Sequence, residues 1–420
     1  MVDQHEWSVR IHEDFRELEQ LEGQWNHWAE DQPFRRYEWQ RTWWEVYGST
    51  SRSRKRSRLL VLEVRHGGEL AGIVPLYCQW HPLWGWVLRW LGSGEVCSDY
   101  LGPIAPACYQ ESVGRVTLIA LHAMATGKSH FQDVSVDRSG AQRVGFHRID
   151  WDGMKADDPA LHAVRTQAEA LKWALDIRPT ESAWQIALPR TWEEYLASLQ
   201  PRSVRRRYRR LSRAYLDHPD LVLHVVGKRE VIGTPCDDNW QSAWNILVQL
   251  HQARRNQLGD QGRFASTPFE IFHRRILADY LPAGRAALAW LEWQGQPIAA
   301  EYLLVSGRTL MAYQSGVNPD FLTLSPGHIM SLSLIRNAIH QGFATFDFLR
   351  GDEPYKRHFG AKPTPLVRIR AAPLQVNARW RFTLWNWGRR SREFLRGMKV
   401  ARSDIAGTAT AEDLPAAVES

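Results

Sequence analysis

Two stretches far apart in the chain share one layout, and this repeat constrains the fold more than any other feature. Residues 60–77, LVLEVRHGGELAGIVPLY, have the pattern of a strand, a glycine-containing turn and a second strand. Residues 288–305, LAWLEWQGQPIAAEYLLV, repeat this pattern with Gly295 at the position of Gly67. The repeat predicts two copies of one α/β unit in tandem.

The second half of the chain shows the elements of its unit most clearly. TWEE, with Thr191 and Glu194, is a capping box that opens a helix, and a second helix is expected in PRSVRRRYRRLSRAYL. A third helix, from Trp240 onward, should bury one face. The members of that face are Trp240, Trp244, Leu247, His251 and Leu258. Three strand-like runs, RAALAWLEW, PIAAEYLLV and RTLMAYQSG, then predict an antiparallel meander, followed by the helix SPGHIMSLSLIRNAIHQG and the strand FATFDFL.

These elements predict an α/β (α+β) fold with two units, each a mixed, mostly antiparallel sheet flanked by helices. The segment 138–160 is rich in Gly and Asp and has no long periodic run, so it is a candidate linker. We place the first unit at 1–180 and the second at 181–375, with a boundary that could lie as far along as residue 185. Residues 376–420 are expected to hold a basic amphipathic helix and a disordered tail.

Composition and charge narrow the class of protein. No basic segment followed by an apolar core opens the chain, and no run of about 18 apolar residues occurs, so we expect a cytoplasmic protein. The cysteines are far apart and lack metal-ligand spacing, so no metal site is implied. A formal net charge of +7 favours an anionic partner: nucleic acid, a membrane surface, an acidic polymer or a phosphorylated cofactor. The chain has no G-x-S-x-G elbow, P-loop or H-E-x-x-H motif, so hydrolase, NTPase and zinc-protease functions lack their residues.

Residues 346–360, FDFLRGDEPYKRHFG, place charges between and after the aromatic residues of a strand. Two interpretations compete. The charges are solvated or paired at an ordinary strand end, or they form the rim of an active site, since ligands of open α/β sheets bind beyond the carboxyl ends of strands.

Four stretches resemble one family: LRWLGSGEVCSDYLGPI, LHQARRNQLGDQGRF, YQSGVNPDFLTLSPGHIM and FDFLRGDEPYKRHFG. They are similar to the tandem GNAT-superfamily acetyltransferases of the CelD-like, cellulose-biosynthesis-associated group. The resemblance covers residues 5–375. It implies two GNAT folds, related in architecture to the Fem-type aminoacyltransferases, with a degenerate first copy and an acyl-CoA site in the second.

The helix that begins at SPGH is a candidate site for the pyrophosphate of acetyl-CoA or another acyl-CoA. A helix N-terminus presents free amides to an anion, and glycine lets the backbone come close. Ser325, Gly327, His328 and Ile329 are the candidate residues. The alternative is that Ser325 only caps the helix. The sequence also departs from the longer glycine-rich phosphate loop of the superfamily.

Direct acyl transfer needs a base for the proton of the acceptor and an acid for the departing thiolate. Glu301 is the candidate base because it lies mid-strand among apolar neighbours, where burial would raise its pKa. The alternative is a structural Glu paired with an Arg across the sheet. The resemblance implies that Tyr355 is the acid, and Asp347 is a third catalytic candidate at the same rim.

Six further residues are candidates for contacts with substrate. Arg350 suits an anionic group. Asp99 is expected to shape acceptor binding or the interface between the halves. His251 is tempting as a base, but its apolar helix face favours a packed, hydrogen-bonded core histidine. The six candidates are Asp99, Tyr100, Tyr313, Arg350, Lys356 and His251.

Two basic helices could contact larger partners. The arginines of 201–216 suit phosphate or carboxylate groups, so RNA or an acidic glycan is conceivable. Residues 379–400 could lie on an anionic membrane surface, at its inner face, or pack onto the protein.

The sequence and the resemblance together predict an acyl-CoA-dependent N- or O-acyltransferase, with a small-molecule or glycan acceptor, in polysaccharide or cell-envelope metabolism. A Fem-type transferase that uses aminoacyl-tRNA and a catalytically silent scaffold of an exopolysaccharide machine are the alternatives.

Overall fold

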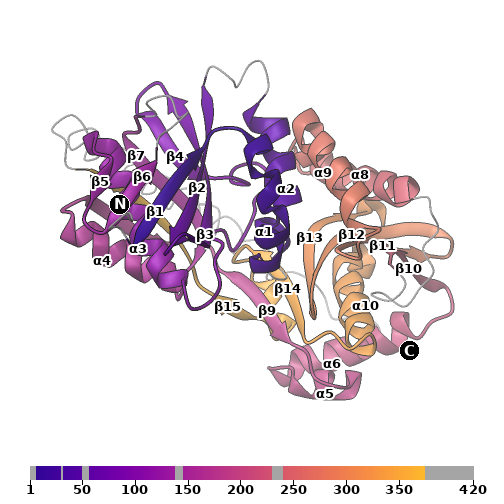
Figure 1. The fold of residues 1–420 in the computed structure, drawn as a ribbon. Coiled ribbons are helices and arrows are strands. Elements are labelled where there is room, and N and C mark those ends of the chain that lie inside the picture. Colours follow the sequence, from indigo (N-terminus) through magenta and orange to yellow (C-terminus); the bar gives the residue numbers. More distant parts are fainter. Residues whose placement is uncertain (1–5, 30–31, 50–55, 138–144, 229–239, 374–420) are drawn as a thin grey trace, which may run out of the picture.

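The structure is a computed structural model, and it describes residues 6–29, 32–49, 56–137, 145–228 and 240–373. Two sheets flanked by helices stand side by side (Figure 1). Within the described residues the first sheet has nine strands in the order β5-β6-β1-β2-β3-β4-β7-β16-β8, and the second has seven in the order β10-β11-β12-β13-β14-β9-β15. The predicted fold class, two tandem units with mixed, mostly antiparallel sheets, is confirmed.

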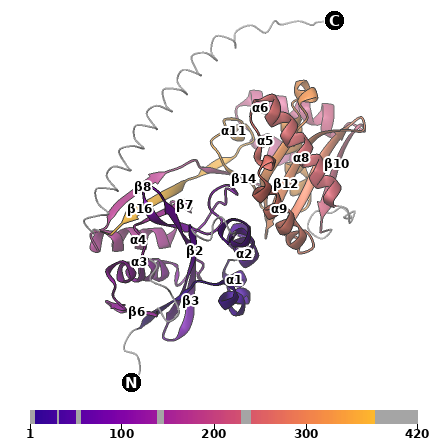
Figure 2. The same ribbon diagram turned by 90° about the horizontal axis from the view of Figure 1, so that it is seen from above.

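The first unit consists of the first sheet and its helices. Its strands are β1 (Trp7–His12), β2 (Ser57–His66), β3 (Glu69–His81), β4 (Gly85–Trp90), β5 (His130–Phe131), β6 (Val134–Asp137), β7 (Arg148–Lys155), β8 (Ala174–Pro179) and β16 (Leu366–Ala372). Its helical segments are η1 (Phe15–Leu21), α1 (Glu22–Trp28), η2 (Pro33–Arg35), α2 (Tyr37–Trp43), η3 (Trp44–Gly48), α3 (Gln110–Thr126) and α4 (Pro159–Ala170). Figure 2 shows α3 and α4 on one face of the sheet and α1 and α2 on the face toward the second unit.

The second unit is built on the second sheet. Its strands are β9 (Ala183–Ala187), β10 (Leu221–Gly227), β11 (Ala286–Trp293), β12 (Gln296–Ser306), β13 (Thr309–Val317), β14 (Thr345–Arg350) and β15 (Lys362–Thr364). Its helical segments are α5 (Trp192–Ser198), α6 (Arg202–Leu211), η4 (Ser212–Leu216), α8 (Trp240–Gln257), η5 (Arg263–Ala265), α9 (Thr267–Tyr280), η6 (Pro319–Leu324), α10 (Pro326–His340) and α11 (Tyr355–His358). Alternation along β12 sends Ala300 and Tyr302 into the core with α8, and Ala299 and Leu303 into the core with α10, so the two helices cover opposite faces.

The two repeated stretches are both hairpins. β2 pairs with β3 and β11 pairs with β12, and Gly67 and Gly295 turn the chain with φ of +57° and +76°, a region that favours glycine. The capping box is also confirmed, because the amide of Glu194 donates to Oγ1 of Thr191 at 3.2 Å and the Glu194 carboxylate accepts from the Thr191 amide. Local patterns therefore predict these elements correctly.

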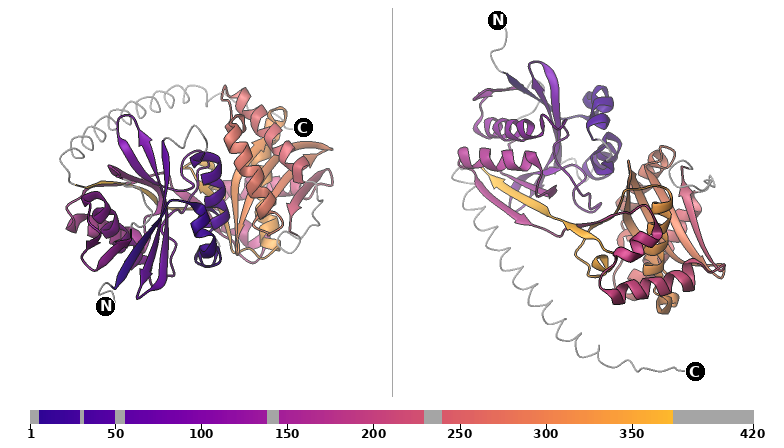
Figure 3. Two further views of the ribbon diagram at one scale, coloured as in Figure 1. Left: turned by 45° about the horizontal axis from the view of Figure 1, so that its top comes forward. Right: turned by 90° about the horizontal axis from the view of Figure 1, so that it is seen from below.

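The units exchange strands. The chain passes from β8 of the first sheet to β9 of the second sheet between residues 179 and 183, next to the predicted boundary. After β15 it returns, and β16 inserts between β7 and β8 of the first sheet (Figure 3). Residues 366–372 therefore complete the first sheet, although the sequence pattern assigns them to the second unit. The predicted helix at 379–400 and the predicted tail lie outside the described residues.

The third helix differs from the prediction at its end. Trp244, Leu247 and His251 of α8 are buried as expected, but the side chain of Leu258 is 58% exposed. The helix ends at Gln257, so Leu258 lies outside it, and the chain turns at Gly259, which has a φ of +74°. In the described part of the chain, none of the helices has the length and apolar character needed to span a membrane.

The second sheet opens between β13 and β14. The two strands run parallel, but they pair only over Thr309–Met311 and Thr345–Asp347, while β13 continues to Val317 and β14 continues to Arg350. A bulge at Tyr313 interrupts the register of β13 with β12 at the same level. Because a bulge bends and twists its strand, β13 diverges from β14, and the divergence leaves a gap in the sheet.

Candidate active site

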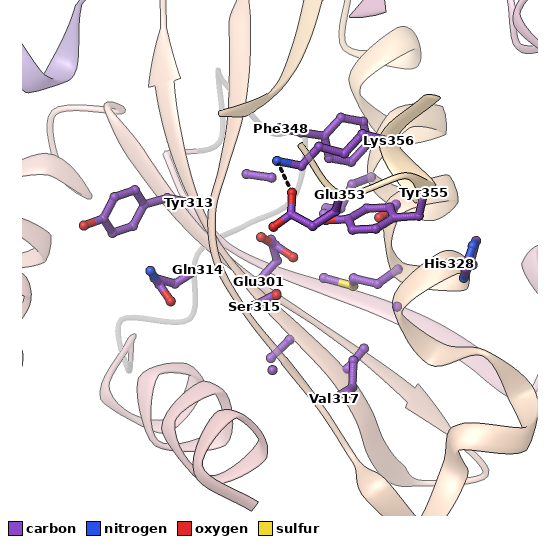
Figure 4. A pocket seen from close by; sticks show the side chains of 18 of the residues that line it. Glu301, Tyr313, Gln314, Ser315, Val317, His328, Phe348, Glu353, Tyr355 and Lys356 are labelled. Atoms are coloured by element: carbon purple, nitrogen blue, oxygen red, sulfur yellow. Dashed lines mark ion pairs between the residues drawn. The ribbon is translucent and has the colours of Figure 1, made fainter. Parts of the chain in front are cut away.

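A cavity of about 450 Å³ lies where β13 and β14 diverge (Figure 4). Residues 312–317 of β13 line one side, and Phe346, Phe348 and Arg350 of β14 line the other. Helix α10 contributes from one face of the sheet and α8, through His251 and Arg255, from the other. The gap therefore connects both faces of the sheet.

Glu301 points into this cavity from the middle of β12 (Figure 4). Its register partners are Ala289 on β11 and Ser315 on β13, and its side chain is almost wholly buried. Within the described residues its carboxylate has no hydrogen-bond or ion-pair partner, so the structural alternative, an Arg across the sheet, is not observed. Burial raises its pKa well above the ordinary value. Glu301 is therefore a carboxyl group that binds a proton more tightly than an exposed glutamate does.

Tyr355 begins α11 on the opposite wall of the cavity (Figure 4). Its ring lies 6.2 Å from that of Phe348 and 6.5 Å from that of His328, both of which line the cavity. Burial raises the pKa of the Tyr355 phenol, and the charges of Glu353 and Glu301 add to the effect. The phenol therefore keeps its proton at neutral pH and can donate it.

The first turn of α10 presents fewer free amides than the sequence suggests. The amides of His328 and Ile329 donate to the carbonyl oxygen of Ser325 at 2.9 and 3.2 Å. The Ser325 side chain makes no capping hydrogen bond, and the residue has a left-handed φ of +59°. Gly327 and His328 line the cavity, while the Ile329 side chain is buried in the core. Among the amides of Gly327, His328 and Ile329, which were predicted to hold phosphate, these two hydrogen bonds leave the Gly327 amide available.

Lys356 does not reach into the cavity as a free cation. Its Nζ donates to the carbonyl oxygens of Leu349, Arg350 and Gly351 at 2.9–3.2 Å, and pairs with Glu353 at 2.9 Å (Figure 4). These carbonyls belong to a turn in which Leu349 has a φ of +57°. The buried ammonium group therefore holds the turn that ends β14.

Replacement of Lys356 by Met should lower the free energy of unfolding by about 1–3 kcal/mol, because the carbonyl oxygens stay buried and lose their donor. Urea denaturation measures this loss. Lys362→Met, at an exposed position on β15, is the control and should change stability by no more than about 0.5 kcal/mol. Equal effects of the two substitutions would show that the ammonium group does not hold the turn.

Arg350 connects the cavity wall to the first unit. Its Nε and its backbone amide both donate to the carboxylate of Asp99 at 2.8 Å, and its Nη1 donates to Asp152 at 3.2 Å. The Asp99 side chain is 1% exposed. Asp99 therefore lies at the interface between the units, one of the two places that the sequence suggests, and the guanidinium of Arg350 is paired there.

Asp347 and Tyr100 meet at the same interface. The Tyr100 hydroxyl donates to Asp347 at 2.7 Å, and the Gln185 amide and the Leu349 backbone amide donate to the same carboxylate, each at 2.8 Å. Burial raises the pKa of Asp347 to about 6, and these hydrogen bonds oppose the rise. Neither Asp347 nor Tyr100 belongs to the cavity lining.

Asp347 should make stability depend on pH. Its pKa in the folded protein lies above the ordinary value of 3.8, so the folded protein binds the proton more tightly than the unfolded chain. The stabilisation is present below about pH 4 and is lost as the pH rises through about 6. Between these values the unfolding free energy of wild type should fall by up to about 3 kcal/mol relative to Asp347→Asn, as measured by denaturation. Parallel curves for the two proteins would contradict this assignment.

Tyr313 and His251 line the cavity but have their polar groups bound elsewhere. The Tyr313 side chain points away from Glu301 (Figure 4), and its hydroxyl contacts the Val96 carbonyl and Nε2 of His273. Nδ1 of His251 lies 2.8 Å from the carbonyl oxygen of Ser315, and Nε2 accepts from the Arg263 amide. His251 is thus the hydrogen-bonded core histidine that its helix face favours.

The structure adds residues that the sequence did not single out. Gln185 and Asp152 bind the interface residues. Gln185 is a polar residue within the short apolar run AWQIA, which is a weak local signal. Nothing local marks Asp152, because its partner lies 198 residues away.

A comparison with protein families identifies the region of the chain that forms the cavity. Residues 202–357 match the acetyltransferase (GNAT) domain family. The matched segment contains the hairpin β11–β12, the diverging strands and Glu301. No curated protein matches the chain.

Several solved structures are similar at low sequence identity. The crystal structure of FemX is 12% identical with a TM-score of 0.48, covering 79% of this chain and 90% of that one. A conserved protein of unknown function from Bacteroides thetaiotaomicron is 11% identical with a TM-score of 0.48, covering 86% and 99%. A tandem GNAT protein from the clavulanic acid biosynthesis pathway is 14% identical with a TM-score of 0.40, covering 76% and 83%.

Proposed function

We propose that the second unit transfers an acyl group from an acyl-CoA thioester to an amine or hydroxyl acceptor, with Glu301 as the general base. The observation that carries the proposal is the unpartnered, buried carboxyl group of Glu301 in a cavity opened by the divergence of β13 and β14. The match of this region to an acetyltransferase domain supports it.

The residues around the cavity can carry both proton transfers. Glu301 takes the proton of the acceptor as the acceptor nitrogen or oxygen attacks the thioester carbon. The tetrahedral intermediate then expels the thiolate, and Tyr355, whose raised pKa keeps it protonated, supplies the proton. The products are the acylated acceptor and the free thiol. Glu301 then releases its proton to solvent and Tyr355 takes one up, which restores both groups.

The cavity suits the pantetheine arm of the co-substrate. An amide-bearing linear chain can pair with the edge of β13 that β14 leaves free, as an added strand pairs with a sheet edge. A volume of about 450 Å³ is within the range of about 300–1,000 Å³ that is typical of small-molecule sites. The acceptor would reach Glu301 by another route, and the α8 residues His251 and Arg255 mark the other face of the sheet.

Calorimetry with CoA and acetyl-CoA tests the proposal. Wild type should bind both, and absence of binding at millimolar ligand would reject the proposal in favour of a tRNA-dependent transferase or a silent scaffold. The identity of the acceptor, including the expected polysaccharide or cell-envelope component, stays a prediction.

Gly327→Asp should abolish CoA binding, because it places a negative charge beside the cavity where the phosphates approach. Gly327→Ala is the matched control: a Cβ there would meet only Val317, at 3.7 Å, so binding should stay within about threefold. Both are measured by calorimetry, with circular dichroism to check folding. Unchanged affinity in folded Gly327→Asp would show that SPGH serves only to begin the helix.

A further inference from the structure

Helix α6 and the following turn carry an uncompensated positive charge. Its seven arginines are Arg202, Arg205, Arg206, Arg207, Arg209, Arg210 and Arg213, and all except the half-buried Arg205 are exposed. None of them forms an ion pair with a described residue. Like charges three and four residues apart on a helix repel each other. The helix therefore carries a stability cost that a bound anion would remove.

This helix packs beside the cavity. The ring of Tyr208, the buried residue of α6, lies 6.2 Å from the ring of His328 and 5.0 Å from that of Phe359, and both of these residues line the cavity. Figure 1 shows α6 close to α10. Burial lowers the pKa of His328, and the positive charge of Arg207 lowers it further.

The first turn of α10 supplies too few donors for a highly charged ligand. As described above, the His328 and Ile329 amides are bonded to Ser325, and Pro326 has no amide hydrogen. Three phosphate groups of CoA therefore need side-chain cations, and arginine is the side chain that binds phosphate through two parallel hydrogen bonds.

Helix geometry selects the arginines. At about 100° per residue, Arg207 and Arg210 lie on one flank of the buried Tyr208, and Arg209 and Arg213 lie on the opposite flank. Arg207 is the arginine whose charge acts on His328. Because Tyr208 packs against His328 and Phe359 of the cavity lining, Arg207 beside it and Arg210 one turn further along the helix are the arginines that we test as the phosphate-binding pair.

We propose that Arg207 and Arg210 of α6 bind the phosphate groups of the acyl-CoA nucleotide, in place of the amides of a helix N-terminus. This proposal rests on the proposed function and adds a binding site outside the diverging strands. The shared chemistry is phosphate, which the 3′-phosphate or the pyrophosphate of the co-substrate can supply.

The test compares two double variants that lose the same charge. Calorimetry measures the affinity of wild type, Arg207→Ala/Arg210→Ala and Arg209→Ala/Arg213→Ala for CoA, dephospho-CoA and pantetheine. We expect Arg207→Ala/Arg210→Ala to weaken CoA at least tenfold and to leave pantetheine unchanged, and the control pair to weaken CoA less than threefold. If wild type binds dephospho-CoA as weakly as Arg207→Ala/Arg210→Ala binds CoA, the arginines hold the 3′-phosphate. If wild type binds dephospho-CoA as tightly as CoA, and Arg207→Ala/Arg210→Ala weakens both ligands equally, the arginines hold the pyrophosphate.

Other results overturn the proposal. A CoA affinity that stays within twofold in Arg207→Ala/Arg210→Ala, or an equal loss in both pairs, would reject it while the proposed function stands. Wild type that binds neither CoA nor pantetheine would reject both. If the protein binds tRNA in a salt-dependent way, and both double variants weaken that binding equally while CoA affinity is unchanged, the arginine surface binds RNA instead. Because all four arginines are exposed, circular dichroism should show folded protein for each pair.

Discussion

Glu301→Gln should lower turnover by about 100- to 10,000-fold and leave CoA affinity unchanged, because a positioned general base contributes this factor and Gln keeps the shape of the side chain. Turnover is measured as thiol release from acetyl-CoA with an accepted amine or hydroxyl compound. The wild-type rate should rise with pH as Glu301, whose pKa burial raises, loses its proton. The difference between the two proteins should shrink at higher pH, once the acceptor deprotonates itself.

Two other carboxylates provide the controls. Glu353→Gln removes the charge that holds Lys356 on the other side of the cavity, and Asp99→Asn removes one at the interface. For folded protein, neither of these two substitutions should lower turnover as much as Glu301→Gln does. The base assignment is wrong if Asp99→Asn or Glu353→Gln abolishes turnover with CoA affinity intact while Glu301→Gln stays within a few-fold of wild type. A drop in melting temperature without a loss of rate would make Glu301 a structural residue.

The parts of the fold that the sequence predicts depend on local patterns. The hairpin β11–β12, the helix α10 and the strand β14 follow from turn residues, periodicity and capping signals within about 20 residues. The position of Glu301 in the cavity follows from the same patterns, since a mid-strand residue between Ala299 and Leu303 must share their face. Burial of that face then accounts for the raised pKa.

The parts that the sequence does not predict depend on contacts between distant segments. The partner of Asp347 lies 247 residues away in Tyr100, and that of Arg350 lies 251 residues away in Asp99. The insertion of β16 into the first sheet has no local signal either. Three of the charges in FDFLRGDEPYKRHFG therefore form no free catalytic rim. Asp347 and Arg350 bind the first unit, and Lys356 holds the turn and pairs with Glu353, as the interpretation of a paired strand end expects.

Arg350→Met should lower the free energy of unfolding by about 3–5 kcal/mol, the range for removal of one partner of a buried ion pair. The Asp99 carboxylate, only 1% exposed, would keep its bond from the backbone amide but lose the guanidinium that compensates its charge. The loss should appear in urea denaturation. It should also weaken CoA binding, because the turn that follows Phe348 forms one wall of the cavity.

A double-mutant cycle separates the pair from its neighbours. Asp99→Asn in the Arg350→Met background removes the uncompensated charge, so the double variant should be more stable than Arg350→Met alone. Asp152→Asn is the matched control, since Asp152 contacts the same guanidinium but is 33% exposed, and it should cost about 1 kcal/mol or less. Strictly additive losses for Asp99 and Arg350 would show that their contact does not join the two units, and the wall of the cavity would then need another support.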